Sequence, residues 1–583
     1  MTQWNLNDLY EGFNERYLND LKTLKDVMDQ FVSDLNQEIT DDQSYLETYL
    51  THEEKLTVLS RNLQSFASLT WATDVSNQEA PKYLAQISQI FRQATVAEVK
   101  FSRYLLNLDL DALAKDSTLI KKYLYLLKRQ KESAKHLLSE AEEVMYSKLR
   151  ELGSSGWSQL QSLLTSNLEV DFKDKKITLS ELRNKAYDND QSIRKEAFET
   201  ELKAYETIDD AVALSLSNIK REVLVLNDLR GYQSPLDQTL FQSKMTKDIL
   251  DAMIDAMSQY REKFAKYLKA KAKYLGHEGS LPFYDMFASV GSLDQSYTYD
   301  EAKDLILKAF DSYSPKLSLF AKKAFDHDWI DVEPKKGKRG GAFCSNQPQI
   351  NQSRILLNFN GSLTNVLTLA HELGHGYHGD VIASNPPLFW SYPMPLAETA
   401  SIFCETITNN YMLKTIDDPK ARLSLLENAL QRDTQVIIDI LSRYFFETEL
   451  FNHATGPINK HQLKSMMTNA QEKAYLDGLD PKTLNPYMWI NKPHYYSAGL
   501  NFYNFPYAFG LLFGKGLYAQ YQKDPNTFIA SYDELLKLTT QKDVYDVAQS
   551  MGIDVSQKDF WLASLALIEK DLDEVIQLFE TLK

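Results

Sequence analysis

The sequence predicts a mostly α-helical fold, and three observations lead to this prediction. Glycine and proline are scarce, at 21 and 17 among 583 residues, and both residue types disfavour helix interiors. Apolar residues recur at spacings of three and four along much of the chain, which is the period of an amphipathic helix. Few segments show the alternation that is typical of a strand. We therefore expect long helices and few strands.

The helical patterns can be followed along the chain. One apolar stripe runs from Leu137 to Leu152 and ends at Gly153, a natural stop for a helix. Similar patterns recur at 81–110, 190–228, 243–275, 300–325, 420–452 and 560–582. The best strand candidates are 168–172 and, in part, 353–359.

A polar, glycine-rich segment from Lys335 to Cys344 interrupts the helical patterns. It predicts a flexible loop leading into an edge strand, and the alternative is an exposed hairpin without a functional role. A polar composition break at 185–195 is a candidate domain boundary. We therefore divide the chain into an N-terminal helical region, 1–190, and a second region, 191–583.

Charge and composition exclude several classes of protein. Lys and Arg number 64 and Asp and Glu 80, so the formal net charge is −16, which argues against a nucleic-acid partner. Two cysteines, Cys344 and Cys404, fit a reducing compartment. The polar N-terminus shows no signal peptide, and no apolar run is long enough to span a membrane. We expect a cytoplasmic protein.

The chemistry is concentrated in the segment His371-Glu372-Leu373-Gly374-His375, which has the pattern H-E-x-x-H. Ser362 is a plausible N-cap of a mostly apolar helix that contains it. Residues four apart on a helix are rotated by roughly 40° and rise by about 6 Å, so two imidazoles can converge on one zinc ion. Glu372 can then act as general base toward a water on the metal. The alternative is a helix with two structural histidines.

A catalytic zinc needs a third protein ligand and an open position. Glu398 and Glu405 lie two helical turns apart in an apolar segment, where a carboxylate is costly unless it is paired or metal-bound. Glu398 is the candidate ligand. Glu405 could fix an imidazole tautomer, or it could be a plain surface carboxylate. His378 could support the site from behind the ligands, or have a purely structural role.

An aromatic run from Lys492 to Gly510 includes His494, Tyr496, Tyr503 and Tyr507. Aromatic stripes usually belong to a hydrophobic core. Peptide hydrolysis, however, creates an oxyanion that hydroxyl or imidazole donors would stabilise. The run therefore also fits an oxyanion-binding and substrate-binding wall.

These motifs together resemble the oligoendopeptidase F branch of the thimet oligopeptidase-like zinc peptidases. The resemblance spans nearly the whole chain, because it also includes four further segments: Trp4–Tyr10, Gly153–Trp157, Arg230–Tyr232 and Gly341–Cys344. The 27-residue step from His371 to Glu398 and the late His494–Tyr507 run make it specific. One departure is Phe505-Pro506, where the family commonly has a tyrosine in place of the phenylalanine.

The resemblance implies a mostly helical, two-lobed fold with a deep substrate channel and a small β-sheet near the active site. It implies one zinc ion bound by His371, His375 and Glu398, with Glu372 as general base and proton shuttle. It also implies that His494 and one or more of the three tyrosines, Tyr496, Tyr503 and Tyr507, contact the substrate carbonyl. Gly340 to Phe343 would form a strand that pairs with the substrate backbone, with Gly341, Ala342 and Phe343 as the substrate-binding residues.

We therefore predict a zinc-dependent oligoendopeptidase that hydrolyses internal bonds of short, unfolded peptides. Its partners would be oligopeptides, with no nucleic acid and no membrane, and the chain would be a monomer or a weak homo-oligomer. One rival is a helical zinc carboxypeptidase. Another is a non-catalytic helical scaffold that only binds peptides, although such a scaffold would be expected to have a broken ligand triad.

Overall fold

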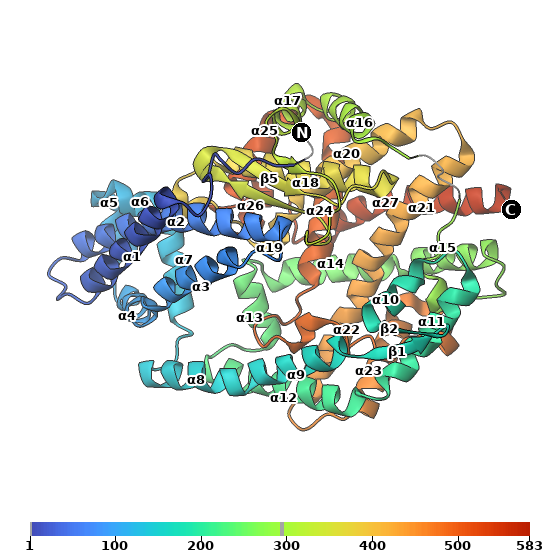
Figure 1. Cartoon of the computed structure of the whole chain (residues 1–583), viewed down its shortest axis with the longest axis horizontal. Helices are drawn as coiled ribbons and strands as arrows, with labels where there is room; N and C mark the ends of the chain where they lie inside the picture. Colours follow the sequence, from blue (N-terminus) through green and yellow to red (C-terminus); the bar gives the residue numbers. More distant parts are fainter. Residues whose placement is uncertain (1–2, 292–295, 583) are drawn as a thin grey trace.

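The computed structural model describes residues 3–291 and 296–582, and most of them lie in α-helices (Figure 1). This confirms the predicted mostly α fold. Three large hydrophobic clusters organise the helices. The first lies in the N-terminal part of the chain, the second in its central and C-terminal parts, and the third joins residues 179–219 to residues 446–496.

The N-terminal cluster contains buried residues from Trp4 to Leu127. Asn14 and Asp41 cap its two longest helices, since their side chains accept hydrogen bonds from the backbone of Tyr17 and Ser44. The predicted helix over 81–110 is divided between α3 and α4, although neither glycine nor proline separates them. The helices are α1 (Glu15–Leu35), α2 (Asp42–Thr73), α3 (Glu79–Arg92), α4 (Thr95–Leu105), α5 (Leu110–Asp116), α6 (Thr118–Lys122) and α7 (Leu124–Ala134).

The segment that follows combines helices with a β-hairpin. The predicted strand at 168–172 is confirmed as β1, which pairs antiparallel with β2. Lys173 and Asp174 both have positive φ, as the tightest hairpin turns require. The elements are α8 (Glu140–Leu152), α9 (Ser154–Ser166), β1 (Glu169–Phe172), β2 (Lys175–Thr178), α10 (Leu179–Asn184), α11 (Gln191–Tyr205), α12 (Asp209–Leu229) and α13 (Pro235–Gln242).

The predicted stripe over 137–152 forms α8, which begins three residues later, at Glu140. Ser139 starts it, because Ser139 and Glu142 form a reciprocal capping box. No residue of α8 is buried, and Met145 and Leu149 expose 56% and 57% of their surface. Helical periodicity therefore predicted the helix correctly. Its apolar face, however, does not pack into a hydrophobic core.

The remaining helices lie in the central and C-terminal parts of the chain. The predicted segment 420–452 is continuous, but a π-helical stretch at Gln435–Asp439 joins its two halves. The elements are α14 (Lys247–Gln259), α15 (Arg261–Tyr274), α16 (Tyr299–Asp311), α17 (Pro315–Asp326), α18 (Leu363–Ile382), α19 (Met394–Ala397), α20 (Thr399–Thr415), α21 (Pro419–Thr434), α22 (Ile440–His453), α23 (Lys460–Tyr475), α24 (Phe505–Lys523), α25 (Pro525–Leu538), α26 (Val544–Gln549) and α27 (Lys558–Thr581).

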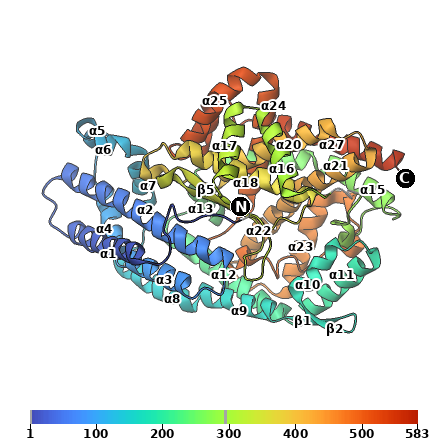
Figure 2. The same ribbon diagram turned by 45° about the horizontal axis from the view of Figure 1, so that its top comes forward.

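A small sheet lies against α18. Its order is β3 (Ile330–Asp331), β5 (Gln352–Leu356), β4 (Phe343–Gln347), with β3 parallel and β4 antiparallel to β5. The predicted edge strand after the glycine-rich segment is therefore confirmed as β4. The predicted strand at 353–359 is shorter than expected and ends at Leu356. The helix α2, from the N-terminal cluster, runs beside this sheet and contacts β4 (Figures 1 and 2).

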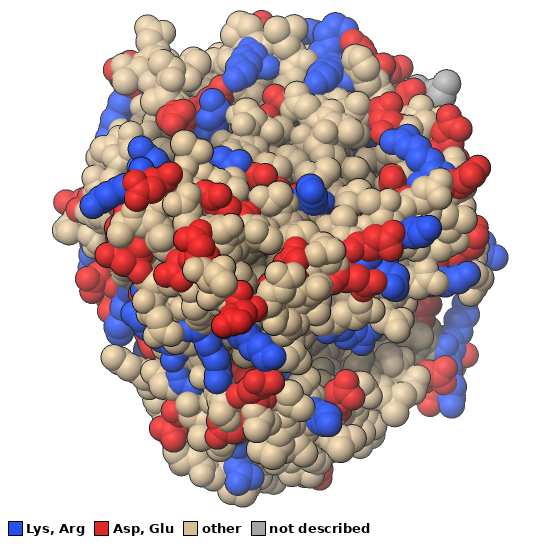
Figure 3. Space-filling view, turned by 90° about the vertical axis from the view of Figure 1, so that its left-hand side faces the viewer, with Lys and Arg blue, Asp and Glu red and all other residues tan. Residues whose placement is uncertain are grey.

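The third cluster brings together residues 179–219 and 446–496. This cluster begins before residue 190. The division of the chain at that residue stays a prediction. Within the described residues, no helix combines the length and apolarity that crossing a membrane would need. Lys and Arg lie among Asp and Glu over the face drawn in Figure 3.

Candidate metal centre and active site

The helix α18 carries the H-E-x-x-H residues, and local sequence fixes where it begins. Ser362 is its N-cap, as predicted, because the Ser362 side chain accepts a hydrogen bond from the backbone of Asn365. Gly374, inside the motif, is required by packing. A Cβ atom there would lie 2.6 Å from both the Ala400 carbonyl oxygen and the Ser401 Cα. The absence of a side chain thus lets α20 approach α18 closely.

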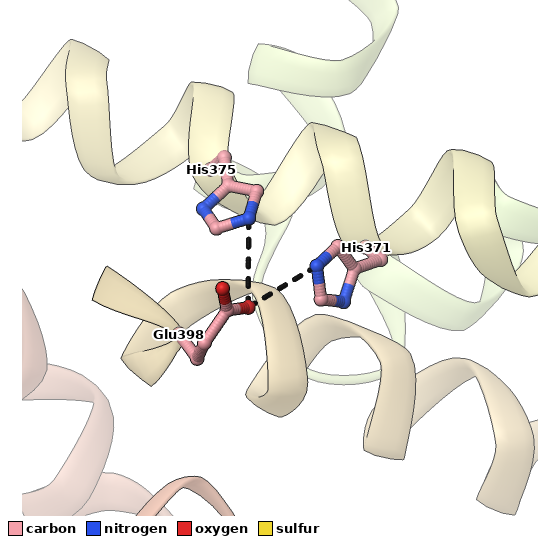
Figure 4. A group of neighbouring side chains, drawn as sticks. All are labelled: His371, His375 and Glu398. Carbon is pink, nitrogen blue, oxygen red and sulfur yellow. Dashed lines mark ion pairs between the residues drawn. The ribbon is translucent and has the colours of Figure 1, made fainter. Parts of the chain in front are cut away.

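This close approach brings three donor atoms together (Figure 4). The Oε2 atom of Glu398 lies 3.2 Å from Nε2 of His371 and 3.6 Å from Nε2 of His375. The three ligand atoms all lie within 4.8 Å of one another. Two atoms bonded to one tetrahedral zinc at about 2.0–2.1 Å lie roughly 3.3–3.4 Å apart. The chemistry and spacing of this donor set therefore fit a zinc ion.

Hydrogen bonds on the other sides of the rings orient both histidines. The Nδ1 atom of His371 lies 3.2 Å from Oε2 of Glu405. The His375 ring is held by a hydrogen bond with the backbone of Ala397. Each ring thus turns its Nε2 atom toward Glu398 (Figure 4), and the orientation of both ligands is fixed before any metal binds.

The charges at the centre depend strongly on one another. Burial would raise the pKa of Glu398, but the hydrogen bond with His371 and the charges of both histidines lower it to about 2. Burial opposes protonation of His371, but its bonds to Glu398 and Glu405 raise its pKa to about 10. Burial and the His371 charge lower the pKa of His375 to about 4. The site thus holds anionic carboxylates that attract positive charge.

Glu405 is not a plain surface carboxylate. Its Oε1 atom lies 2.7 Å from Nη2 of Arg432, while its Oε2 atom faces His371. Burial would raise the pKa of Glu405, but the Arg432 charge and the His371 hydrogen bond lower it to about 2. The arginine therefore keeps Glu405 ionised, and the ionised carboxylate holds the His371 ring.

We expect Glu405→Gln to weaken zinc binding by about 10–100-fold, the usual effect of removing a partner that orients a ligand. The amide keeps the shape of the side chain but loses the charge that fixes His371. Competition with a chromophoric chelator measures the affinity. Glu574→Gln is the matched control, because Glu574 also pairs with an arginine, Arg422, but on the remote helix α27. An affinity equal to that of the wild type would remove Glu405 from this role.

Glu372 faces the same site from between the two histidines. Its side chain is 6% exposed, and burial raises its pKa to about 7 despite the nearby His371 charge and a hydrogen bond from the backbone of Cys344. A carboxylate with a pKa near neutrality accepts a proton readily and returns it readily. The sequence assigned this residue to the general-base role, and its environment suits that chemistry.

The helix α24 forms a neighbouring wall. Its Gly510 lies against Glu398, since a Cβ atom there would be 2.6 Å from the Glu398 Cβ. One turn earlier, the hydroxyl of Tyr507 lies 2.7 Å from that of Tyr503. Burial, this hydrogen bond and the charge of Glu398 all raise the pKa of Tyr507. The Tyr507 hydroxyl is therefore a protonated donor close to Glu398.

The unusual proline and phenylalanine at the start of α24 have a structural explanation. Pro506 lies in the first turn, where the missing N–H leaves no helical hydrogen bond unmade. Phe505 is 1% exposed and belongs to the main hydrophobic cluster. Phe505 thus carries no donor and is used for packing, which leaves Tyr503 and Tyr507 as the hydroxyl-bearing residues of this turn.

A chain of hydrogen bonds orients His494. Nη1 of Arg443 donates to Oδ1 of Asn504 at 2.5 Å, so the Asn504 amide nitrogen faces Nε2 of His494 at 3.1 Å. That arrangement makes Nε2 an acceptor and leaves the proton on Nδ1. Burial and the charges of Arg443, Lys220 and Lys492 lower the pKa of His494 to about 3. His494 is thus a neutral N–H donor.

Two of the predicted residues lie elsewhere. Tyr496 is fully buried and its hydroxyl donates to the carbonyl of Trp489 at 3.0 Å, so this hydroxyl is already used within the third cluster. His378 lies on α18 but bonds Thr539 through Nε2 at 2.9 Å and stacks on the ring of Tyr392 at 4.1 Å. It supports a tyrosine near the site and contacts none of the three ligands.

The predicted substrate strand begins later than expected. Gly341 and Ala342 precede β4, which starts at Phe343. The Phe343 ring packs against Trp4, with ring centroids 6.2 Å apart. The backbone that faces Glu372 belongs to the next residue, Cys344. The strand edge beside Glu372 is thus centred one residue past the predicted segment.

Sequence reasoning missed three residues that shape the site: Arg432, Arg443 and Asn504. Asn504 lies inside the aromatic run and was available to inspection. The two arginines carry no local signal, because they belong to α21 and α22 and reach their partners only through folding.

Comparisons with known proteins agree with this geometry. Residues 185–567 match the model of peptidase family M3, and residues 108–169 match one described as oligopeptidase F. Oligopeptidase PepF of Bacillus subtilis is 24% identical over all of this chain and 88% of its own length. An oligoendopeptidase F homolog of Lactococcus lactis is 25% identical over 92% of this chain and 90% of its own length. The crystal structure of oligoendopeptidase-F from Enterococcus faecium superposes with a TM-score of 0.71 at 18% identity, covering 98% of this chain and 99% of that one.

The helical fold and the His-His-Glu site together define a metallopeptidase. The family model spans more than half of the sequence, so the chain belongs to peptidase family M3.

Proposed function

We propose that this protein is a zinc-dependent oligoendopeptidase that cleaves internal bonds of short peptides. The observation that carries the proposal is the convergence of His371, His375 and Glu398 on one point, with Glu372 beside them. The similarity to an oligoendopeptidase F homolog of Lactococcus lactis and to group B oligopeptidase PepB of Streptococcus agalactiae supports the same substrate class. We also infer a cytoplasmic location, which fits the two free cysteines, Cys344 and Cys404.

His371, His375 and Glu398 would hold the metal. When bound, zinc polarises the scissile carbonyl and acidifies the attacking water. Glu372 takes the proton from that water as it attacks, because its carboxylate is buried and has a pKa near neutrality. The same carboxylic acid then gives the proton to the leaving amine, so the residue ends each cycle ionised.

The wall formed by His494, Tyr503 and Tyr507 supplies donors to the developing oxyanion. The Tyr503 hydroxyl can donate to Tyr507 and so leave the Tyr507 proton free for the substrate. The Nδ1–H of His494 is a second donor that Asn504 holds in one tautomer. Donors fixed before the reaction stabilise the transition state more than the ground state.

We expect Tyr507→Phe to lower kcat by about 10²-fold, the lower end of the effect of losing one such donor, with zinc content unchanged. Tyr521→Phe is the control, because Tyr521 lies on the last turn of the same helix and packs on Tyr313 instead. Steady-state kinetics and elemental analysis check both. A wild-type kcat in Tyr507→Phe would assign oxyanion binding to other groups.

The proposed function is tested by digesting a peptide that is blocked at both ends, with and without a chelator, and identifying the products by mass. An endopeptidase needs no free terminus and cleaves it, and the chelator abolishes cleavage. A carboxypeptidase would leave the blocked peptide intact and cleave only its free-acid form. A peptide-binding scaffold would cleave neither form in the presence of zinc.

A further inference from the structure

The edge strand β4 offers free backbone groups that lead away from the metal centre. It pairs on one side only, with β5, and backbone groups of alternate residues point to opposite edges. Cys344 faces outward, because its partner Ile355 uses its backbone N–H to bond Trp329 on the other side of β5. Two residues on, Asn346 also faces outward, since its carbonyl accepts from Arg61. A peptide added to this edge would extend from Glu372 toward Arg61.

A groove runs along this edge. Its cavity has a volume of about 560 Å³, within the range of about 300–1,000 Å³ that is usual for ligand sites. Residues 344–346 of β4 and residues 390–392 form one side. The opposite side is the polar face of α2, with residues at helical spacing: Thr57, Ser60, Arg61, Gln64, Ser65 and Ser68.

Arg61 is the cationic residue of this groove. Within residues 3–291 and 296–582, no carboxylate lies within ion-pair distance of its guanidinium. It makes one long hydrogen bond, from Nη1 to the Asn346 carbonyl at 3.4 Å, and it lies 5.9 Å from the centre of the Trp390 ring. Burial lowers its pKa. A guanidinium has five N–H donors, so most of them have no protein partner here.

The groove adjoins the helix that carries the candidate metal ligands. Asn346 lines the groove, and its side-chain Nδ2 donates to the carbonyl of His375 at 3.1 Å. Tyr392 also lines it and stacks on His378 of the same helix, with ring centroids 4.1 Å apart. A substrate held at the metal centre by one part of its chain can therefore place another part beside Arg61.

We propose that Arg61 is a specificity-determining residue that binds a carboxylate of the peptide substrate lying along β4. The guanidinium of Arg61 already donates to the outward carbonyl of Asn346. Backbone pairing of a peptide with β4 therefore ends there, and a carboxylate at that point accepts hydrogen bonds from the free N–H groups of Arg61. The carboxylate is either an acidic side chain or the C-terminus of the peptide. The proposal rests on the proposed function. Through Arg61, the helix α2 takes part in substrate choice. This helix lies outside both matched family models.

The test uses quenched fluorescent peptides that share one scissile bond. One set is neutral, a second carries a single glutamate on either side of that bond, and a third has a free instead of an amidated C-terminus. The holoenzyme is expected to favour one of the two acidic sets over the neutral set by about 10-fold or more in kcat/KM, through KM, because a remote ion pair contributes equally to ground-state and transition-state binding. The set that is favoured identifies the source of the carboxylate.

Arg61→Gln is expected to abolish this preference, so that it cleaves the acidic and neutral peptides with equal kcat/KM. Arg92→Gln, an exposed arginine of α3, should keep the preference. If Arg61→Gln does not fold, Arg61→Lys keeps the charge without the bidentate fork and should lower the preference but not abolish it. Equal cleavage of all peptides by the wild type, or a preference that survives in Arg61→Gln, overturns the proposal. Cleavage of none of them would instead contradict the proposed function itself.

Discussion

Glu372→Gln is expected to lose about 10²- to 10⁴-fold in kcat while keeping its zinc. The amide cannot accept the proton of the attacking water, and a positioned general base contributes a factor of this size. Glu372 is not among the three donors that converge at the site, so the metal should stay bound. Peptide kinetics and elemental analysis of the same sample measure both properties.

A measurement of thermal stability distinguishes the loss of the general base in Glu372→Gln from unfolding of the variant. The pKa of Glu372 is raised to about 7 by burial, so the folded state disfavours the charged form, and this cost is present above pH 7 and absent well below it. The neutral Gln removes the cost, and the Tm of the metal-free variant should not fall at pH 8. Glu449→Gln, on the exposed face of α22, is the control and should retain full activity. Near-normal turnover in Glu372→Gln would refute the general-base role.

Glu398→Ala is expected to lose the metal and, with it, the activity. The change removes one of three donors and the negative charge that both histidines face. The loss of affinity should exceed the about 10–100-fold that is typical of residues acting behind a ligand. Zinc content after dialysis should therefore fall from one ion per chain to a small fraction.

A thermal shift provides a second measurement of the same prediction. Zinc that binds only the folded state raises the free energy of unfolding in proportion to the logarithm of its concentration over Kd. The wild type and Glu449→Gln should show this rise, and Glu398→Ala should show little of it. A variant that kept full zinc and the full thermal shift would remove Glu398 from the ligand set.

The two predictions are related, because the same helices position both carboxylates. Gly374 lets α20 approach α18, and Gly510 lets α24 approach Glu398. The ligand atom of Glu398 is thus placed by contacts on two sides, while Glu372 is placed by the helix that also carries the histidines. Mutations that separate these helices should affect metal binding first.

The sequence by itself determined what depends on neighbours in the chain. Helical periodicity and the Ser362 cap placed the H-E-x-x-H residues on one helix, whose geometry alone turns His371 and His375 to a common side. The sequence also singled out Glu398 in its apolar segment and the aromatic run, and the resemblance then made their roles specific. The mostly helical fold followed from the scarcity of glycine and proline.

The tertiary structure decided what depends on residues that are distant in sequence. Nothing local showed that Arg432 would hold Glu405, that Arg443 would set the tautomer of His494, or that Arg61 would face the edge of β4. It also decided which predicted residues point elsewhere, since Tyr496 bonds Trp489. Periodicity reports which face of a helix is apolar, but only the packing of the other helices decides what that face meets.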